Sequence, residues 1–160
     1  MTVRLHCAYA AARGLVICGG DVTQAFSQGD WPDHVKKVYA RMPDGHNAYY
    51  KGVFYCCEVG NLYGHPIAGR NWYLTLCHRM KHFGYEQSAH DPCKFHKYYK
   101  GDDEFHMVLY VDDILTFSPK DSSTLYTDWK EWFDKEFMWT DFDTNLHEFT
   151  SVNITQMHSR

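Results

Sequence analysis

Residues 108–115 read VLYVDDIL, an apolar and β-prone run that the adjacent carboxylates of Asp112 and Asp113 interrupt. Aspartate is depleted from strands, and two neighbouring charges in a buried run are costly unless a cation offsets them. A divalent-metal site and a hairpin turn that uses Asp-Asp are both consistent with this pattern. The metal site is favoured because hairpin turns prefer Asn-Gly or Asp-Gly, and the stretch contains no glycine.

A third carboxylate, Asp21, follows the β-prone run LVICGG of residues 15–20. An aspartate after a strand is by itself usually a turn or cap residue. Together with Asp112 and Asp113, however, it completes a set that could hold two Mg²⁺ ions about 3.5–4 Å apart for in-line phosphoryl transfer.

Apolar periodicity predicts three helices and several short strands. The helices are expected from Thr2 through Ala12, over 70–83, and from Ser122 or Ser123 to Phe137, where Trp129 and Phe133 belong to a core-facing stripe. The strands are expected over residues 15–18, 35–42, 53–57, 94–99, 105–117 and 149–154, with an acidic turn at 101–104. Together these elements predict an α+β domain with an antiparallel sheet and helices on one face.

Composition narrows the class of protein. A chain of 160 residues fits one ordinary domain, and 44% apolar with 17% aromatic residues excludes a disordered tail. The net charge of −4 hides an asymmetry, because residues 1–100 carry 12 Lys and Arg against 7 Asp and Glu, and residues 101–160 carry 4 against 13. No apolar run approaches the roughly 20 residues of a transmembrane helix. The six cysteines lack the spacing of a disulfide framework, which predicts reduced thiols in an intracellular chain without a membrane partner.

Two motifs carry a family resemblance. The segment DVTQAF, residues 21–26, resembles the first catalytic motif of retroelement reverse transcriptases, and YVDD, residues 110–113, resembles their Tyr-x-Asp-Asp box. Further phrases follow in the order of copia-type polymerases of LTR retrotransposons: VRL at 3–5, GD at 29–30, MPDG at 42–45, LYG at 62–64, Arg70 with WY at 72–73, and DPCKF at 91–95. The resemblance covers Val3 to about Ile154.

The resemblance implies a ferredoxin-like polymerase palm, with an antiparallel sheet backed by helices, and RNA-directed DNA polymerase activity. Asp21 and Asp112 would ligate two Mg²⁺ ions, for which Mn²⁺ could substitute, and Asp113 would lie close by as the third carboxylate. The main-chain carbonyl of Val22 would be a further ligand.

The resemblance also implies a nucleotide site. Backbone amides around Gln24 and Ala25 would hold the triphosphate, and Phe26 would be the aromatic gate that rejects a ribose 2′-hydroxyl. In the second motif Ile67 stands where the family has glutamine, three residues before Arg70. Gly20 stands where an apolar residue is usual, which predicts a looser strand before Asp21.

Residues 1–160 are interpreted as a partial reverse transcriptase domain, a palm with part of the fingers and without thumb or RNase H. The implied partners are an RNA or DNA template–primer, a dNTP and the rest of a retroelement polyprotein, and the implied location is a cytoplasmic particle or the nucleus. A catalytically inactive remnant that at most binds nucleic acid is the main alternative, motivated by Ile67. A metal-dependent phosphohydrolase would explain the three aspartates but not the other ordered motifs.

Overall fold

The computed structural model describes residues 2–46, 49–51, 53–54, 56–99, 104–119, 123–141, 146–150 and 152–155. Within them the helices are α1 (Thr2–Arg13), a 3₁₀ turn η1 (Ala25–Gln28), α2 (Ala68–His82) and α3 (Ser123–Glu136). The strands are β1 (Leu15–Val22), β2 (Val38–Arg41), β3 (Tyr49–Tyr50), β4 (Val53–Phe54), β5 (Cys56–Val59), β6 (Glu86–Gln87), β7 (Lys94–Tyr98), β8 (Glu104–Tyr110), β9 (Asp113–Pro119), β10 (Trp139–Asp141), β11 (Leu146–Phe149) and β12 (Val152–Thr155).

The main sheet has six strands in the order β10-β1-β9-β8-β7-β6, and every neighbouring pair is antiparallel. The central strand β1 pairs with β9 from Leu15↔Pro119 to Asp21↔Asp113 and with β10 on its other side. Helix α2 lies in the connection from β1 towards β8, and α3 connects β9 to β10. The predicted α+β class with an antiparallel sheet is therefore confirmed.

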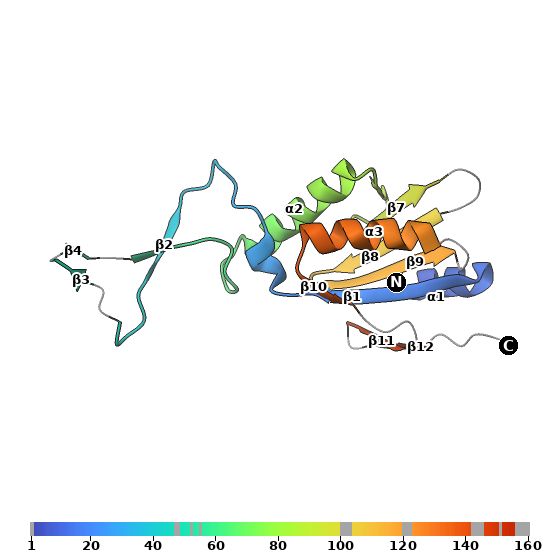
Figure 1. Ribbon diagram of the computed structural model, residues 1–160, viewed down its shortest axis with the longest axis horizontal. Helices are drawn as coiled ribbons and strands as arrows, with labels where there is room; N and C mark the ends of the chain where they lie inside the picture. The colour runs from blue at the N-terminus through green and yellow to red at the C-terminus, as the bar shows by residue number, and fades with distance from the viewer. Residues whose placement is uncertain are drawn as a thin grey trace.

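Both faces of the sheet are covered, which corrects the expectation of helices on one face only. Alternate residues of β8 point in opposite directions. Phe105, Met107 and Leu109 join a core with α2 and α3, whereas Val108 joins a second cluster with Ala10 of α1. Figure 1 shows α2 and α3 on one side of the sheet and α1 on the other. The physical reason is that β8 and β9 carry apolar side chains on both faces, including Val108, Leu115 and Phe117 on the α1 side, so each face needs a cover.

The three predicted helices are confirmed to within a few residues. Trp129 and Phe133 are fully buried, as expected of a core-facing stripe. No helix in the described part of the chain is long and apolar enough to cross a membrane. All six cysteines are free thiols.

Four short strands form an arm that projects away from the main sheet between η1 and α2 (Figure 1). In the arm β2 pairs with β5, and β3 pairs with β4. The predicted strand over 35–42 is shortened to β2, and the one over 53–57 is divided into β4 and β5. The predicted final strand over 149–154 is instead the hairpin β11–β12. Of the predicted acidic turn, residues 101–103 lie outside the described part.

Candidate active site

The two interpretations of the Asp-Asp stretch turn out to describe one feature. Strand β8 ends at Tyr110 and β9 begins at Asp113, which pair with each other, so Val111 and Asp112 form a two-residue hairpin turn. Val111 adopts φ 57°, and Asp112 does not have a positive φ, which is the pattern of a type II′ turn. A positive φ is rare for a β-branched residue, and such strain concentrates at functional sites. The turn therefore presents the carboxylates at the end of the hairpin.

Three carboxylates meet at this end of the sheet. Asp21 lies within β1, directly opposite Asp113 in the β1–β9 register, and Asp112 occupies the adjoining turn. Each of the three can offer an oxygen within 4.8 Å of the others, and all are half-buried. Among the described residues they form the only group of three or more His, Cys, Asp or Glu with such spacing.

Burial and neighbouring charge make Asp21 reluctant to ionise. Burial raises the pKa of Asp21 above its ordinary value, and the negative charges of Asp112 and Asp113 raise it further. A bound divalent cation would reverse this effect by offsetting the like charges. Clustered carboxylate oxygens are the ligands that Mg²⁺ and Mn²⁺ prefer, so this donor set fits the expected metal.

Two hydrogen bonds fix the main chain of the turn. The Val22 amide donates to the Asp112 carbonyl at 2.9 Å, which ties the turn to the end of β1. The indole Nε1–H of Trp72, in α2, donates to the Val111 carbonyl at 2.6 Å. The sequence alone indicates no such role for Trp72, although this residue belongs to the motif that follows Arg70. The predicted metal ligation by the Val22 carbonyl remains a prediction.

A third hydrogen bond reaches the site from the hairpin β11–β12. The amide of Thr150, at the hairpin turn, donates to Oδ2 of Asp113 at 3.0 Å. Thr150 has φ 49°, and the preceding residue Phe149 is buried against the α1 side of the sheet. No sequence signal indicated this contact, because it joins segments 37 residues apart through a main-chain group.

The predicted nucleotide-binding residues follow Asp21 directly in space as well as in sequence. Gln24 is in the left-handed region, with φ 49° and ψ 45°, and starts η1. Ala25 is fully buried, and the half-buried ring of Phe26 stacks on Tyr63 at a centroid distance of 4.6 Å and an interplanar angle of 24°. The side chain of Gln28 holds the end of this segment against the residue before β10, through hydrogen bonds to Met138.

The second predicted motif lies at the start of α2. Ile67 is half-buried immediately before the helix, and Arg70 is exposed in its first turn. A Cβ on Gly69 would be 3.5 Å from the ring of Phe26. The fold thus brings the start of α2 next to the Phe26 ring, although the two are more than 40 residues apart.

Gly20 does not loosen β1, contrary to expectation. The strand continues through Gly20 to Val22, with regular pairing to both neighbours. A Cβ on Gly20 would overlap the ring of Trp139, in β10, and would lie 2.5 Å from the carbonyl oxygen of Thr140. The large Trp139 side chain therefore fills the space that an apolar side chain at position 20 would occupy.

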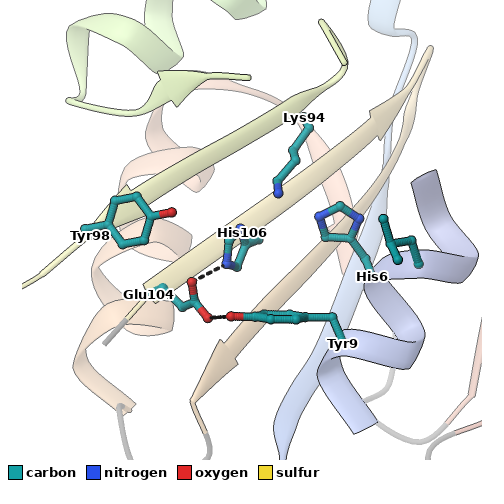
Figure 2. Close-up of a pocket in the computed structure, with 7 residues that line it drawn as sticks. His6, Tyr9, Lys94, Tyr98, Glu104 and His106 are labelled. Carbon is teal, nitrogen blue, oxygen red and sulfur yellow. Dashed lines mark hydrogen bonds and ion pairs between the residues drawn. The ribbon is translucent and has the colours of Figure 1, made fainter. Parts of the chain in front are cut away.

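A second polar cluster lies at the opposite end of β8 from the carboxylates (Figure 2). The carboxylate of Glu104 accepts a hydrogen bond from the Tyr9 hydroxyl and lies 2.8 Å from Nε2 of His106. Burial lowers the pKa of His106; burial alone would raise the pKa of Glu104, but hydrogen bonds from Tyr9 and His106 hold it below its ordinary value. The cluster surrounds a pocket of about 300 Å³ lined by Leu5, His6, Tyr9, Lys94, Tyr98, Glu104 and His106. Because these contacts join α1 to β8, we interpret the cluster as a structural one that holds the helix against the sheet.

The fold and the site define a class of α+β domains in which three carboxylates, from adjoining antiparallel strands and their hairpin turn, form a candidate site for divalent metal ions. Within that class, residues 1–159 match the family "Reverse transcriptase (RNA-dependent DNA polymerase)", and the chain belongs to this family. It is 31% identical over 114 residues to the "Retrovirus-related Pol polyprotein from transposon TNT 1-94" of Nicotiana tabacum. It is 32% identical over 114 residues to the "Retrovirus-related Pol polyprotein from transposon RE1" of Arabidopsis thaliana.

Each of these matches covers 71% of this chain and 8% of the relative, so the chain spans a small part of the length of its curated relatives. No solved structure matches the chain. The predicted resemblance to copia-type retrotransposon reverse transcriptases is confirmed by the family and by both relatives.

Proposed function

We propose that the chain carries the nucleotidyl-transfer site of an RNA-directed DNA polymerase, in which a primer 3′-hydroxyl attacks the α-phosphate of a dNTP. The observation that carries the proposal is the convergence of Asp21, Asp112 and Asp113 within 4.8 Å. Two Mg²⁺ ions, or Mn²⁺ in their place, would activate the hydroxyl and neutralise charge on the transferred phosphoryl group.

The protein groups have separate parts in this proposal. Asp21 and Asp112 would provide carboxylate oxygens to the metal ions, and Asp113 would add a third negative charge beside them. The raised pKa of Asp21 means that its proton and a cation compete for the same carboxylate. The hydrogen bonds to the Asp112 carbonyl and the Asp113 carboxylate keep both residues in place before substrate binds, which is the preorganisation that electrostatic catalysis needs.

The proposed dNTP site comprises the amides around Gln24 and Ala25 and the ring of Phe26. The left-handed turn at Gln24 supports this assignment because it redirects the chain immediately after Asp21. The stacked Tyr63 and the nearby Gly69 limit the positions that the Phe26 ring can adopt. A fixed ring under the sugar leaves room for a 2′-hydrogen but not for a hydroxyl. Ile67 and Arg70 would lie beside the nucleotide and the template.

We infer that the main sheet is a ferredoxin-like polymerase palm and that the arm is part of the fingers. The palm is supported by the strand order β10-β1-β9-β8, with α2 leading from β1 towards β8 and α3 connecting β9 to β10, which is the split β-α-β-β-α-β arrangement. The partners proposed are an RNA or DNA template–primer and the remaining parts of a Pol polyprotein, and the location proposed is a cytoplasmic particle or the nucleus.

A non-catalytic remnant that binds nucleic acid is the second candidate. It is favoured by Ile67, because an apolar side chain cannot make the hydrogen bonds of the family's glutamine. The phosphohydrolase alternative is less well supported, since the family match covers residues 1–159 rather than the aspartates alone.

Primer extension with Mg²⁺ and dNTPs tests the proposal. Asp112→Asn should abolish extension because it removes a metal ligand. The matched control is Asp44→Asn, since the Asp44 side chain is 98% exposed and pairs with Arg41 across a surface turn. Equal extension by wild type and Asp112→Asn would place the chemistry elsewhere. Tight binding of template–primer by a wild-type protein that extends no primer would establish the remnant.

A further inference from the structure

The direction of the Val111 carbonyl is coupled to the direction of the Asp112 side chain in the turn. The peptide plane between Val111 and Asp112 can face in two directions, and rotating it converts a type II′ turn into a type I′ turn. The rotation would give Asp112 a positive φ and swing its side chain to a new direction. The observed turn has a positive φ at Val111 only, so the plane is held in one of the two states.

Trp72 makes the contact that distinguishes these states. Its Nε1–H donates to the Val111 carbonyl at 2.6 Å, and a rotated plane would point that carbonyl away from the indole. The Trp72 side chain is buried, with 1% exposure, so an indole N–H left without its acceptor would be costly. The hydrogen bond therefore favours the type II′ state.

Trp72 is itself held rigidly. Its ring packs edge to face against Phe137, with centroids 5.3 Å apart. A Cβ on Gly29 would lie 2.9 Å from the Trp72 main chain, so the segment after Phe26 and helix α2 are in direct backbone contact. The Asp30 amide also donates to the hydroxyl of Thr75, one turn further along α2. Helix α2 is thus fixed against Gly29 and Asp30, which follow η1.

We propose that Trp72 is a positioning residue of the active site, whose indole N–H locks the Val111–Asp112 peptide plane and thereby sets the direction of the Asp112 carboxylate relative to Asp21. This inference rests on the proposed function, because it concerns the same site. It adds a residue from α2 that acts through the turn.

The test is Trp72→Phe, which keeps an aromatic ring and removes the N–H. Trp129→Phe is the matched control: Trp129 is also fully buried, but its Nε1 has no hydrogen-bond partner among the described residues. The first readout is hydrogen exchange of the Val22 amide, which donates to Asp112 and reports on the turn without any activity. The second is the dissociation constant for Mn²⁺ alone, measured by electron paramagnetic resonance.

In Trp72→Phe, Val22 should exchange about three- to tenfold faster relative to the other slow amides of β1 and β9, as expected for the loss of one hydrogen bond. Mn²⁺ binding should weaken by a similar factor, whereas Trp129→Phe should change all amides together and leave Mn²⁺ affinity unaltered. If Trp72→Phe does not fold, benzothienylalanine at position 72 replaces the N–H by sulfur in a ring of the same shape. Identical behaviour of the position-72 and position-129 variants in both readouts would overturn the proposal. Absence of primer extension by wild type, with Val22 still selectively deprotected, would refute the polymerase function and leave the locked turn standing.

Discussion

Gly20→Ala is expected to destabilise the protein although it adds a single methyl group. In an ordinary strand the change would be favourable by about 0.5–1 kcal/mol, since alanine loses less conformational freedom than glycine. Here the new Cβ would overlap the Trp139 ring and approach the Thr140 carbonyl oxygen to 2.5 Å. Either the tryptophan or strand β10 must therefore move.

The magnitude follows from what Trp139 would give up. Its ring contacts Trp129 and Phe133 at centroid distances of 5.4 and 5.3 Å, and its Nε1–H donates to Asp134. Overpacking costs about 1–3 kcal/mol, and each disturbed aromatic pair adds about 0.5–1.5 kcal/mol. After the favourable backbone contribution is subtracted, the net loss in the free energy of unfolding is about 1–5 kcal/mol.

Urea denaturation of a double-mutant cycle measures this coupling. In a Trp139→Ala background the ring is gone and only the Thr140 contact remains, so the cost of Gly20→Ala should fall by at least about 1 kcal/mol. Gly60→Ala is the matched control, because a Cβ there would meet nothing within 4 Å. The same cost for Gly20→Ala in both backgrounds would refute the argument that Trp139 occupies the space above Gly20.

Phe26→Ala should raise incorporation of ribonucleotides, and Tyr63→Ala should do so to a smaller extent by releasing the stacked ring of Phe26. The ratio of kcat/KM for a dNTP to kcat/KM for the corresponding rNTP measures both effects. An unchanged ratio would contradict the assignment of Phe26 as the gate against the 2′-hydroxyl. Asp21→Asn should stabilise the folded protein at neutral pH: the raised pKa means that the folded state binds the Asp21 proton more tightly, so stability falls as pH rises through that pKa. The gain should therefore shrink as pH falls through the folded-state pKa of Asp21, and it should vanish below the lower pKa of this carboxyl in the unfolded chain, where both states bind the proton. Mg²⁺ at about ten times its Kd should stabilise wild type by about 1.4 kcal/mol and Asp21→Asn less, and equal shifts would argue against metal binding at this residue. Gln28→Ala should cost about 1–3 kcal/mol by removing its hydrogen bonds to Met138, with Gln28→Asn, whose shorter amide cannot reach, behaving alike.

Much of the candidate active site could be predicted from local sequence. Asp21, Asp112 and Asp113 stood out because charged residues are unusual in apolar, β-prone runs, and the structure brings all three together. The helices were predicted to within a few residues because their apolar periodicity is strong, as in the stripe that includes Trp129 and Phe133.

Other features could not be derived in this way. The sequence favours a metal site over a hairpin turn at Val111 because the stretch lacks glycine, yet in the fold valine occupies that turn with φ 57°, and its carbonyl accepts a hydrogen bond from Trp72. The covering of the second face by α1 and the division of the final strand into a hairpin were also missed. Each depends on contacts between distant segments, which local preference does not encode.

Residue type, spacing and ordered motifs are local properties of the chain, so the kinds of elements, the family and the identity of the three carboxylates follow from them directly. The orientation of those carboxylates follows from contacts between distant segments. Their direction depends on an indole from α2, an amide from β1 and an amide from the β11–β12 turn. The close packing of Gly20 against Trp139 also depends on the tertiary structure, because the neighbouring strand determines how much space lies beside a glycine.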